Sequence, residues 1–208
     1  EKRSVNNIVK QVTEKGKTLL VDCPASVTLL SGEAEILGAD FKASSKMVIR
    51  EGKRVPFLVR EKAEFELLLG ERGTATEFET TTIPQSWENA VNTVLNEKKE
   101  PLAVMIVGGI DSGKTSFCVY LANKALKTKR KVTIVDADLG QADVGPPSTI
   151  GSCRITKPIR DPFQMNAENI CFIGVTSPSN ASTKVVEAIA RMKEKALTRP
   201  VNILIINT

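Results

Sequence analysis

The amino-acid sequence predicts an α/β domain with a doubly wound, mostly parallel sheet, preceded by a small all-β, sandwich-like domain. Two patterns support this prediction. Short β-type runs, separated by Gly, Pro, Ser and charged clusters, fill the first part of the chain, and strands alternate with helical periodicities in the rest. We therefore expect an N-terminal β domain over residues 1–82 and an α/β domain over residues 83–208.

The first domain is expected to consist of short strands joined by turns, as in a sandwich or a small barrel. Residues Lys62–Leu69 alternate partly between polar and apolar side chains, which is consistent with one face in water. Residues 70–82 are polar and rich in Thr, and we expect a linker there. The predicted strands are Leu19–Asp22, Ser26–Leu30, Ala34–Leu37, Met47–Arg50, Val55–Val59 and Phe65–Leu69.

The second domain is expected to begin with a helix around residues 87–95, with Ser86 as its N-cap. The continuous apolar run Leu102–Val107 then predicts a buried parallel strand, and a helix to about Lys127 follows. Because a strand without its following helix is an unusual end for a domain, we expect the full protein to continue beyond Thr208. The other predicted elements are the strands Val132–Asp136, Ile170–Val175 and Val201–Asn207 and the helix Lys184–Leu197.

The composition limits the kinds of function that the chain can have. Of the 208 residues 41% are hydrophobic, so we expect a packed core, while only 4% are aromatic, so large base-stacking platforms are not evident. The net charge of +5 permits a polyanionic partner without requiring one. The sequence has no histidine, which excludes a histidine base, histidine zinc ligands and a Ser-His-Asp triad within this chain.

The four cysteines, Cys23, Cys118, Cys153 and Cys171, form no C-x-x-C pair, so zinc-ribbon and thioredoxin interpretations fail. Their use fits a reducing compartment, and we expect a cytoplasmic protein, or a nuclear one in a eukaryote. The longest apolar stretch is too short to span a bilayer, and we see no signal peptide. We therefore expect no membrane partner.

The segment Gly108–Thr115 matches G-x-x-x-x-G-K-[ST] between a strand and a helix, the context that makes this motif informative. It predicts a P-loop, in which glycines let backbone N–H groups point at phosphate oxygens and the helix N-terminus adds positive potential. Lys114 supplies a charge for the β- and γ-phosphates of ATP, and Thr115 offers a hydroxyl to Mg²⁺. The candidate nucleotide-binding residues are Gly108, Gly109, Ile110, Asp111, Ser112, Gly113, Lys114, Thr115 and Ser116. The α/β domain is thus expected to be a P-loop NTPase domain.

Two carboxylates, Asp136 and Asp138, follow the next predicted strand at the sheet edge where α/β proteins bind ligands. An Asp at this place completes the Mg²⁺ shell in P-loop enzymes, and both residues are candidate metal ligands. One can hold metal-bound water while the other accepts a proton from an attacking hydroxyl. The alternative is that one of the two only caps the turn.

Three further polar stretches lie near the predicted site or close to it in sequence. The loop Gly140–Pro147 is stiffened by prolines, and Gln141 is a candidate to orient water or a phosphate oxygen; the alternative is a plain connection. Thr176–Pro178 follows a strand at the same edge, where turn and cap chemistry is an equal interpretation. For the basic run Lys127–Lys131 we favour interaction with the helix C-terminus over contact with RNA.

Three stretches of the sequence together point to one family. They are the P-loop with Asp111 inside it, the run Val135–Gln141 followed by Gly145-Pro146-Pro147, and the run Leu30–Gly38. In this combination the chain resembles, over nearly its whole length, the polyribonucleotide 5′-hydroxyl kinases. That family includes the kinase subunit of the eukaryotic pre-mRNA cleavage factor, pre-ribosomal RNA processing kinases and archaeal RNA kinases. The P-loop alone is generic, whereas the other two runs are much more specific.

The resemblance implies a fold and a set of roles. It implies a β-sandwich domain, a central P-loop domain and a small C-terminal domain, with ATP and Mg²⁺ as cofactors. By it, Lys114 and Thr115 handle phosphate and metal, and Asp138 is the base toward the RNA 5′-hydroxyl. The N-terminal domain helps hold the adenine in such relatives, and Arg54 or Lys53 is our candidate for that contact.

The sequence departs from the family pattern at its end. In these kinases the last apolar strand leads into Asn-Thr-x-Gly-Trp, whereas here Asn207 and Thr208 are the final residues. The RNA-clasping aromatic and the arginine-bearing lid would lie beyond them. We therefore expect this fragment to bind nucleotide better than it performs chemistry.

The predicted function is ATP-dependent transfer of the γ-phosphate to the 5′-hydroxyl of RNA, in RNA processing. The expected partners are ATP, the 5′ ends of RNA or DNA, and RNA-processing proteins. A scaffold that binds ATP with little or no kinase activity is one alternative. A P-loop ATPase or GTPase switch unrelated to RNA is another.

Overall fold

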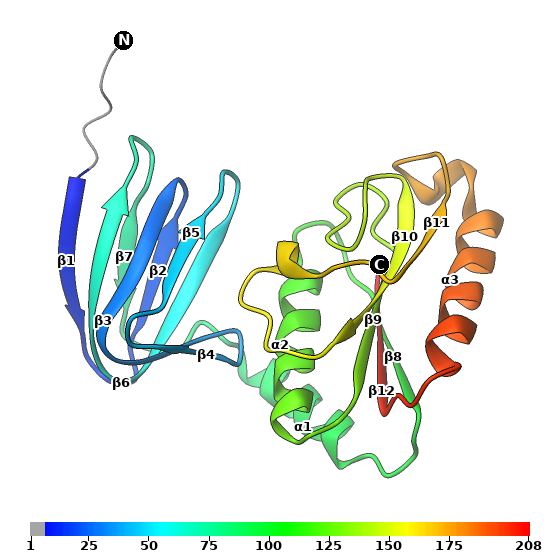
Figure 1. Cartoon of the computed structure of the whole chain (residues 1–208), viewed down its shortest axis with the longest axis horizontal. Helices are drawn as coiled ribbons and strands as arrows, with labels where there is room; N and C mark the ends of the chain where they lie inside the picture. The colour runs from blue at the N-terminus through cyan, green and yellow to red at the C-terminus, as the bar shows by residue number, and fades with distance from the viewer. Residues whose placement is uncertain (1–6) are drawn as a thin grey trace. The chain divides into compact units, whose positions relative to one another are not determined.

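The computed structural model describes residues 7–208, and the chain divides into two compact units, one ending at Ser86 and one running from Trp87 to Thr208. Figure 1 draws the strands and helices of both units. The domain limits at residues 82 and 83 stay a prediction, because a division by packing does not test where an independently folding domain ends. Among the described residues, none of the helices is long and apolar enough to cross a membrane.

The first unit is an antiparallel β sheet with the order β4-β3-β6-β2-β7, to which β1 adds on β6 and β5 on β3. Alternate residues of its strands fill one core, in which Phe57 makes edge-to-face ring contacts with Phe41 and Phe65. Its strands are β1 (Asn7–Thr13), β2 (Thr18–Asp22), β3 (Ala25–Ile36), β4 (Ala39–Lys42), β5 (Lys46–Ile49), β6 (Arg54–Leu69) and β7 (Ala75–Phe78).

Two long strands replace four of the predicted short ones. The runs 26–30 and 34–37 are both parts of β3, apart from the last residue of the second, and the runs 55–59 and 65–69 are both parts of β6. Gly32 explains why β3 reads as two pieces. It has φ +84°, and a Cβ there would lie 2.1 Å from the carbonyl oxygen of Lys62, and the pairing of β3 with β6 shifts register around this residue.

The predicted linker over residues 70–82 is wrong in part. It contains β7, which pairs antiparallel with β2 and forms an edge of the sheet. The polar composition reflects this edge position, because the side chains of β7 alternate between half-buried and exposed.

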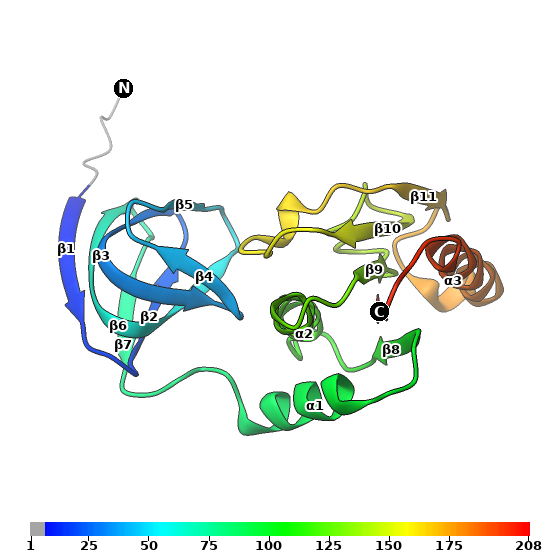
Figure 2. The same cartoon turned by 60° about the horizontal axis from the view of Figure 1, so that its bottom comes forward.

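The second unit is a five-stranded sheet with the order β11-β10-β9-β12-β8, which has α2 on one face and α3 on the other (Figures 1 and 2). Strands β8, β12 and β9 are parallel, whereas β10 is antiparallel to both neighbours. The elements are α1 (Gln85–Asn96), β8 (Leu102–Ile106), α2 (Lys114–Lys127), β9 (Val132–Asp136), β10 (Thr149–Ile155), β11 (Asn169–Phe172), α3 (Ser182–Leu197) and β12 (Ile203–Asn207). The predicted fold class is confirmed.

Two local predictions in this unit are wrong. The first helix begins at Gln85, so Ser86 lies inside it and is not its N-cap. Strand β8 is parallel as predicted, but it is not buried on both faces, since Met105 is 51% and Val107 73% exposed. The reason is its position, because within residues 7–208 it pairs only with β12 and forms the edge of the sheet.

Candidate active site

The predicted P-loop joins β8 to α2 at the carboxyl end of the parallel strands. Gly108–Gly113 form the turn, and Lys114, Thr115 and Ser116 occupy the first positions of α2. Gly113 stands at the N-cap position with φ +84°, and no side chain caps this helix end. The first N–H groups of α2 are therefore available to an anion, as phosphate binding at a helix N-terminus requires.

The Lys114 side chain folds back over this turn. Its Nζ donates a hydrogen bond of 2.9 Å to the carbonyl oxygen of Gly109. This contact holds a positive charge above the N–H groups of the turn, which is where phosphate oxygens would lie. The ammonium group has further donors, so it can bind phosphate while keeping or exchanging this bond.

Trp87 of α1 supports the turn from behind. A Cβ added at Gly113 would lie 3.3 Å from the Trp87 ring, a tight contact, and the φ of +84° at this position independently favours glycine. The indole also packs edge-to-face on Phe117 at 5.2 Å and contacts Tyr120 at 6.2 Å between ring centroids. In the sequence Trp87 indicates only the helical spacing, and its supporting role was not predicted.

Asp136 ends β9 and is almost completely buried, with 1% of its surface exposed. Its Oδ2 accepts hydrogen bonds from the backbone N–H groups of Asp143 (2.7 Å) and Val144 (3.0 Å). Its Oδ1 accepts from the N–H of Asp138 (3.2 Å) and from the Nδ2 of Asn207 (3.1 Å). Four donors thus fill the acceptor positions of the carboxylate. Burial raises the pKa of Asp136 above its ordinary value, and these four hydrogen bonds oppose that rise.

Asn207 connects this carboxylate to the P-loop helix. Strand register places it beside Asp136, and its Nδ2 also donates to the Oγ1 of Thr115 at 3.3 Å. Its Oδ1 accepts a weak bond from the Cys118 thiol at 3.4 Å, and burial raises the pKa of that thiol, which favours the protonated donor. We did not predict this function for Asn207. The available signal was a polar residue that ends an apolar strand at the ligand-binding edge.

Asp138 lies two residues further, in the loop after β9, and is half-buried. Its Oδ1 accepts from the N–H groups of Gly140 (3.0 Å) and Gln141 (2.9 Å), which fixes the orientation of the carboxylate. Within the described part of the chain, its Oδ2 has no hydrogen-bond partner. One oxygen therefore holds the turn while the other is free to accept a proton. Gln141 is exposed and contributes its backbone N–H to this turn.

The remaining predicted positions bond within their own unit or act in turns. Arg54 belongs to the first unit, where it forms an ion pair with Asp22, and the hydrogen bond from Arg54 lowers the pKa of that carboxyl. Ser177 caps a short 3-10 turn through the N–H of Ser179. Within the basic run, Arg130 donates to the carbonyl oxygen of Leu95 at the end of α1, so this part of the run stabilises the fold.

Comparison with known proteins places this cluster in a family. The sequence model described as the P-loop of the mRNA cleavage and polyadenylation factor CLP1 matches residues 108–208, which extend from the first glycine of the turn through Asn207. This segment belongs to the CLP1 P-loop family. The predicted resemblance is thereby confirmed, and every candidate site residue except Arg54 and Lys53 lies inside the CLP1 P-loop match.

The relatives that the chain matches include archaeal kinases and animal CLP1 homologues. A polyribonucleotide 5′-hydroxyl-kinase of Pyrococcus abyssi is 32% identical over 118 residues, which cover 57% of this chain and 33% of that protein. One from Methanocaldococcus jannaschii is 35% identical over 99 residues, covering 48% and 27%. The CLP1 homologue of Brugia malayi is 29% identical over 200 residues, covering 86% and 46%. The chain therefore spans less than half the length of these relatives.

A solved structure shows the same fold. In the complex of Clp1p with a Pcf11p fragment, the matched chain superposes on 99% of this chain with a TM-score of 0.79 and 17% identity, over 55% of its own length. A second structure, described as explaining ATP loss in a Clp1p point mutant, also has a TM-score of 0.79, with 18% identity. Both units thus have the arrangement of strands and helices found in Clp1p.

The CLP1 P-loop segment has the groups that a magnesium nucleotide needs. Mg²⁺ keeps several waters and binds phosphates with one or two protein oxygens, so it needs no cage of carboxylates. Among residues 7–208 no such cage of three or more Cys, Asp or Glu side chains exists. The hydroxyl of Thr115 would be a direct ligand, and Asp136, whose oxygens are occupied, would act through a water. The donor set therefore fits Mg²⁺ bound together with a nucleotide.

Proposed function

We propose that this protein is an ATP-dependent polynucleotide 5′-hydroxyl kinase that acts on RNA. The observation that carries the proposal is the pair formed by the P-loop and Asp138. The turn and Lys114 would hold a triphosphate, and Asp138 presents a free Oδ2 at the same edge of the sheet. The names of the archaeal relatives support this choice of reaction.

The proposed reaction assigns one task to each group. The turn N–H groups and Lys114 bind the phosphates of ATP, and Thr115 with Asp136 holds Mg²⁺, which would neutralise charge on the transferred phosphoryl group. The RNA 5′-oxygen attacks the γ-phosphorus, and the bond from that phosphorus to the β–γ bridging oxygen breaks. The hydroxyl proton passes to Oδ2 of Asp138. The products are 5′-phosphorylated RNA and ADP.

The test is a labelling assay on the full-length protein with γ-labelled ATP and 5′-hydroxyl RNA or DNA of the same sequence. We expect Asp138→Asn to lower the rate on RNA by about 100-fold or more, because a positioned base is worth that much. Lys114→Ala should abolish the ATP-dependent labelling. A matched control is Asp161→Asn, because Asp161 caps a 3-10 turn away from the site and Asn can form the same cap. Full activity of Asp138→Asn would disprove the base assignment.

A scaffold function is the second candidate. The similarity to Clp1p in its complex with a Pcf11p fragment favours it, because that protein is seen holding a partner. In this case the protein binds ATP at the same turn but transfers no phosphate. Equilibrium binding of ATP without labelling of any 5′-hydroxyl RNA would support the scaffold and contradict the kinase.

A further inference from the structure

The face of the sheet that α3 covers changes from apolar to polar side chains along strands β9 and β10. Near the carboxyl end of β9 it is apolar, with Val135, Ile150 and Ile206 among the residues in the core under α3. Nearer the start of β9 the same face is polar. Strand register pairs Thr133 with Arg154, and Ser152 with both Val135 and Asn169, so these polar residues share the α3 side with that core. A helix-to-sheet layer is ordinarily apolar, and this departure needs an explanation.

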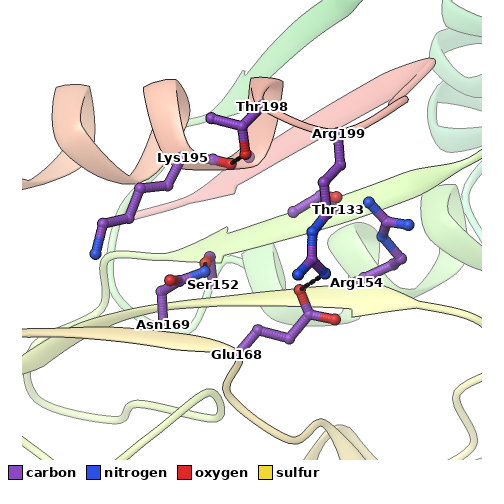
Figure 3. Close-up of a pocket in the computed structure, with 9 residues that line it drawn as sticks. Thr133, Ser152, Arg154, Glu168, Asn169, Lys195, Thr198 and Arg199 are labelled. Carbon is purple, nitrogen blue, oxygen red and sulfur yellow. Dashed lines mark hydrogen bonds and ion pairs between the residues drawn. The ribbon is translucent and has the colours of Figure 1, made fainter.

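A pocket of about 420 Å³ opens over this polar area. Figure 3 shows the side chains of its lining gathered from β9, β10, the start of β11 and the end of α3. The small side chain of Ala196 on α3 leaves the space free. The lining residues are Thr133, Ser152, Arg154, Glu168, Asn169, Lys195, Ala196, Thr198 and Arg199.

The pocket has an excess of positive charge. Three cationic side chains line it, and Glu168 is the only carboxylate among the lining residues. Glu168 lies 3.7 Å from Arg199, a long and largely exposed ion pair. Neither the Arg154 guanidinium nor the Lys195 ammonium has a partner among the described residues. Figure 3 draws Arg154 and Arg199 in the lining of the same pocket, where Arg199 pairs with Glu168.

Neutral donors complete the lining. The hydroxyl of Ser152, which is 2% exposed, accepts a bond from the Nδ2 of Asn169 at 3.1 Å, so its own proton is free to point elsewhere. Thr198 lies at the rim, next to Arg199. The lining thus combines guanidinium, hydroxyl and amide donors, the groups that bind phosphate oxygens.

We propose that this pocket binds a phosphate group and is a second anion site, distinct from the P-loop. Thr133 and Asp136 stand at opposite ends of β9, about 10 Å apart along the strand at the usual rise per residue. They also face opposite sides of the sheet. Thr133 lies on the side of α3, whereas Asp136 bonds to Asn207, whose amide also reaches Thr115 of α2. The phosphate comes either from an RNA strand or from a small phosphorylated molecule.

The test uses NMR on the full-length ¹⁵N-labelled protein carrying Lys114→Ala, which weakens anion binding at the P-loop. Titration with inorganic phosphate should shift the amides of Asn169, Thr198 and Arg199. The double change Arg154→Gln and Arg199→Gln should weaken the apparent Kd by about tenfold or more, because it removes charge-assisted hydrogen bonds. The matched control is Arg191→Gln, an exposed change on α3 outside the pocket, which should leave the titration unchanged.

Two further arms identify the source of the phosphate. A single-stranded RNA that shifts the same amides at lower concentration than phosphate assigns the site to the RNA backbone. If AMP, but not RNA, does so, the site belongs to a small molecule. Amides that do not shift with any of the three probes would overturn the proposal. It would also be overturned if the double variant, shown to be folded by its other resonances, responded to phosphate as strongly as the protein without the two arginine changes. The kinase assay plays no part in this test. A negative NMR result therefore does not contradict the kinase proposal, and a negative kinase assay does not contradict the second anion site.

Discussion

The polar side chains at and beside the two ends of β9 differ in whether they have hydrogen-bond partners. At the carboxyl end, the carboxylate of Asp136 is bonded to four N–H donors, and Asn207 links it to Thr115. Beside the start of β9, the Arg154 guanidinium on β10 has no partner among the described residues and shares a pocket with Arg199 and Lys195. A buried network in which every polar group is hydrogen-bonded holds its members in one geometry. Unpaired cations, in contrast, break no internal hydrogen bond or ion pair when they bind a ligand. The first arrangement suits positioning of groups, and the second suits binding of an anion.

Removal of the Asp136 side chain is expected to have the largest effect on the free energy of unfolding. Asp136→Ala leaves four donors without their acceptor, and unsatisfied buried groups cost roughly 1–3 kcal/mol each before water or relaxation compensates. We expect the free energy of unfolding to fall by about 3 kcal/mol or more, measured by urea denaturation. Asp138→Ala, which frees two donors in an exposed turn, should cost about 1 kcal/mol. Equal losses for the two variants would contradict this account.

The amide of Asn207 should have the next largest effect. Asn207→Ala removes one donor from Asp136 and the bond to Thr115, and we expect a loss of about 1–3 kcal/mol in unfolding free energy. The nearby control is Asn202→Ala, because that half-buried side chain bonds at the opposite, amino end of β12, to Lys131 and Glu100. Under the proposed kinase reaction, Asn207→Ala should also weaken Mg²⁺ binding, measured as a higher Mg²⁺ concentration for half-maximal labelling by the full-length protein.

The pH dependence of stability gives a smaller effect with a definite sign. Because burial raises the pKa of Asp136 above the ordinary value of 3.8, the folded protein binds this proton more tightly than the unfolded chain. The contribution of Asp136 to stability is therefore full below that ordinary value and declines as the pH rises through the raised pKa. Asp22 has a lowered pKa, so its contribution runs the other way and is lost on acidification. Carboxyl ¹³C shifts followed against pH would check both directions.

A change at the other end of β9 should have the smallest effect on stability. Arg154→Gln removes a charge that has no partner among the described residues. We expect the free energy of unfolding to change by less than about 0.5 kcal/mol, as for most surface changes, in dilute buffer without phosphate. In phosphate buffer the wild type should gain stability relative to this variant. A large loss in phosphate-free buffer would show that Arg154 is structural.

The parts of the site that the sequence predicted are those with local causes. The turn Gly108–Thr115 is predictable because glycine spacing determines the backbone of one short segment. Asp136 and Asp138 follow a strand directly, so their position at the sheet edge needs only the strand itself. Their assigned roles in chemistry remain predictions.

The parts that were missed depend on pairing between distant segments. Asn207 lies 92 residues from Thr115, and only the register of β12 between β8 and β9 brings them together. Strand β10 was missed because Gly, Ser and Cys give it little β-type character, although pairing with β9 buries it. The pocket over Arg154 needs α3 and three strands in place, so no motif in the sequence indicates it.

The contact between Trp87 and the P-loop has a practical consequence. Trp87 is the single tryptophan of these 208 residues, and its ring packs against Gly113, where the turn meets α2. Its intrinsic fluorescence therefore originates next to the nucleotide site, without any dye or tag. A change in emission when ATP is added would report binding at that turn. Stopped-flow mixing would then give the rates of nucleotide binding and release from the fluorescence of this one indole.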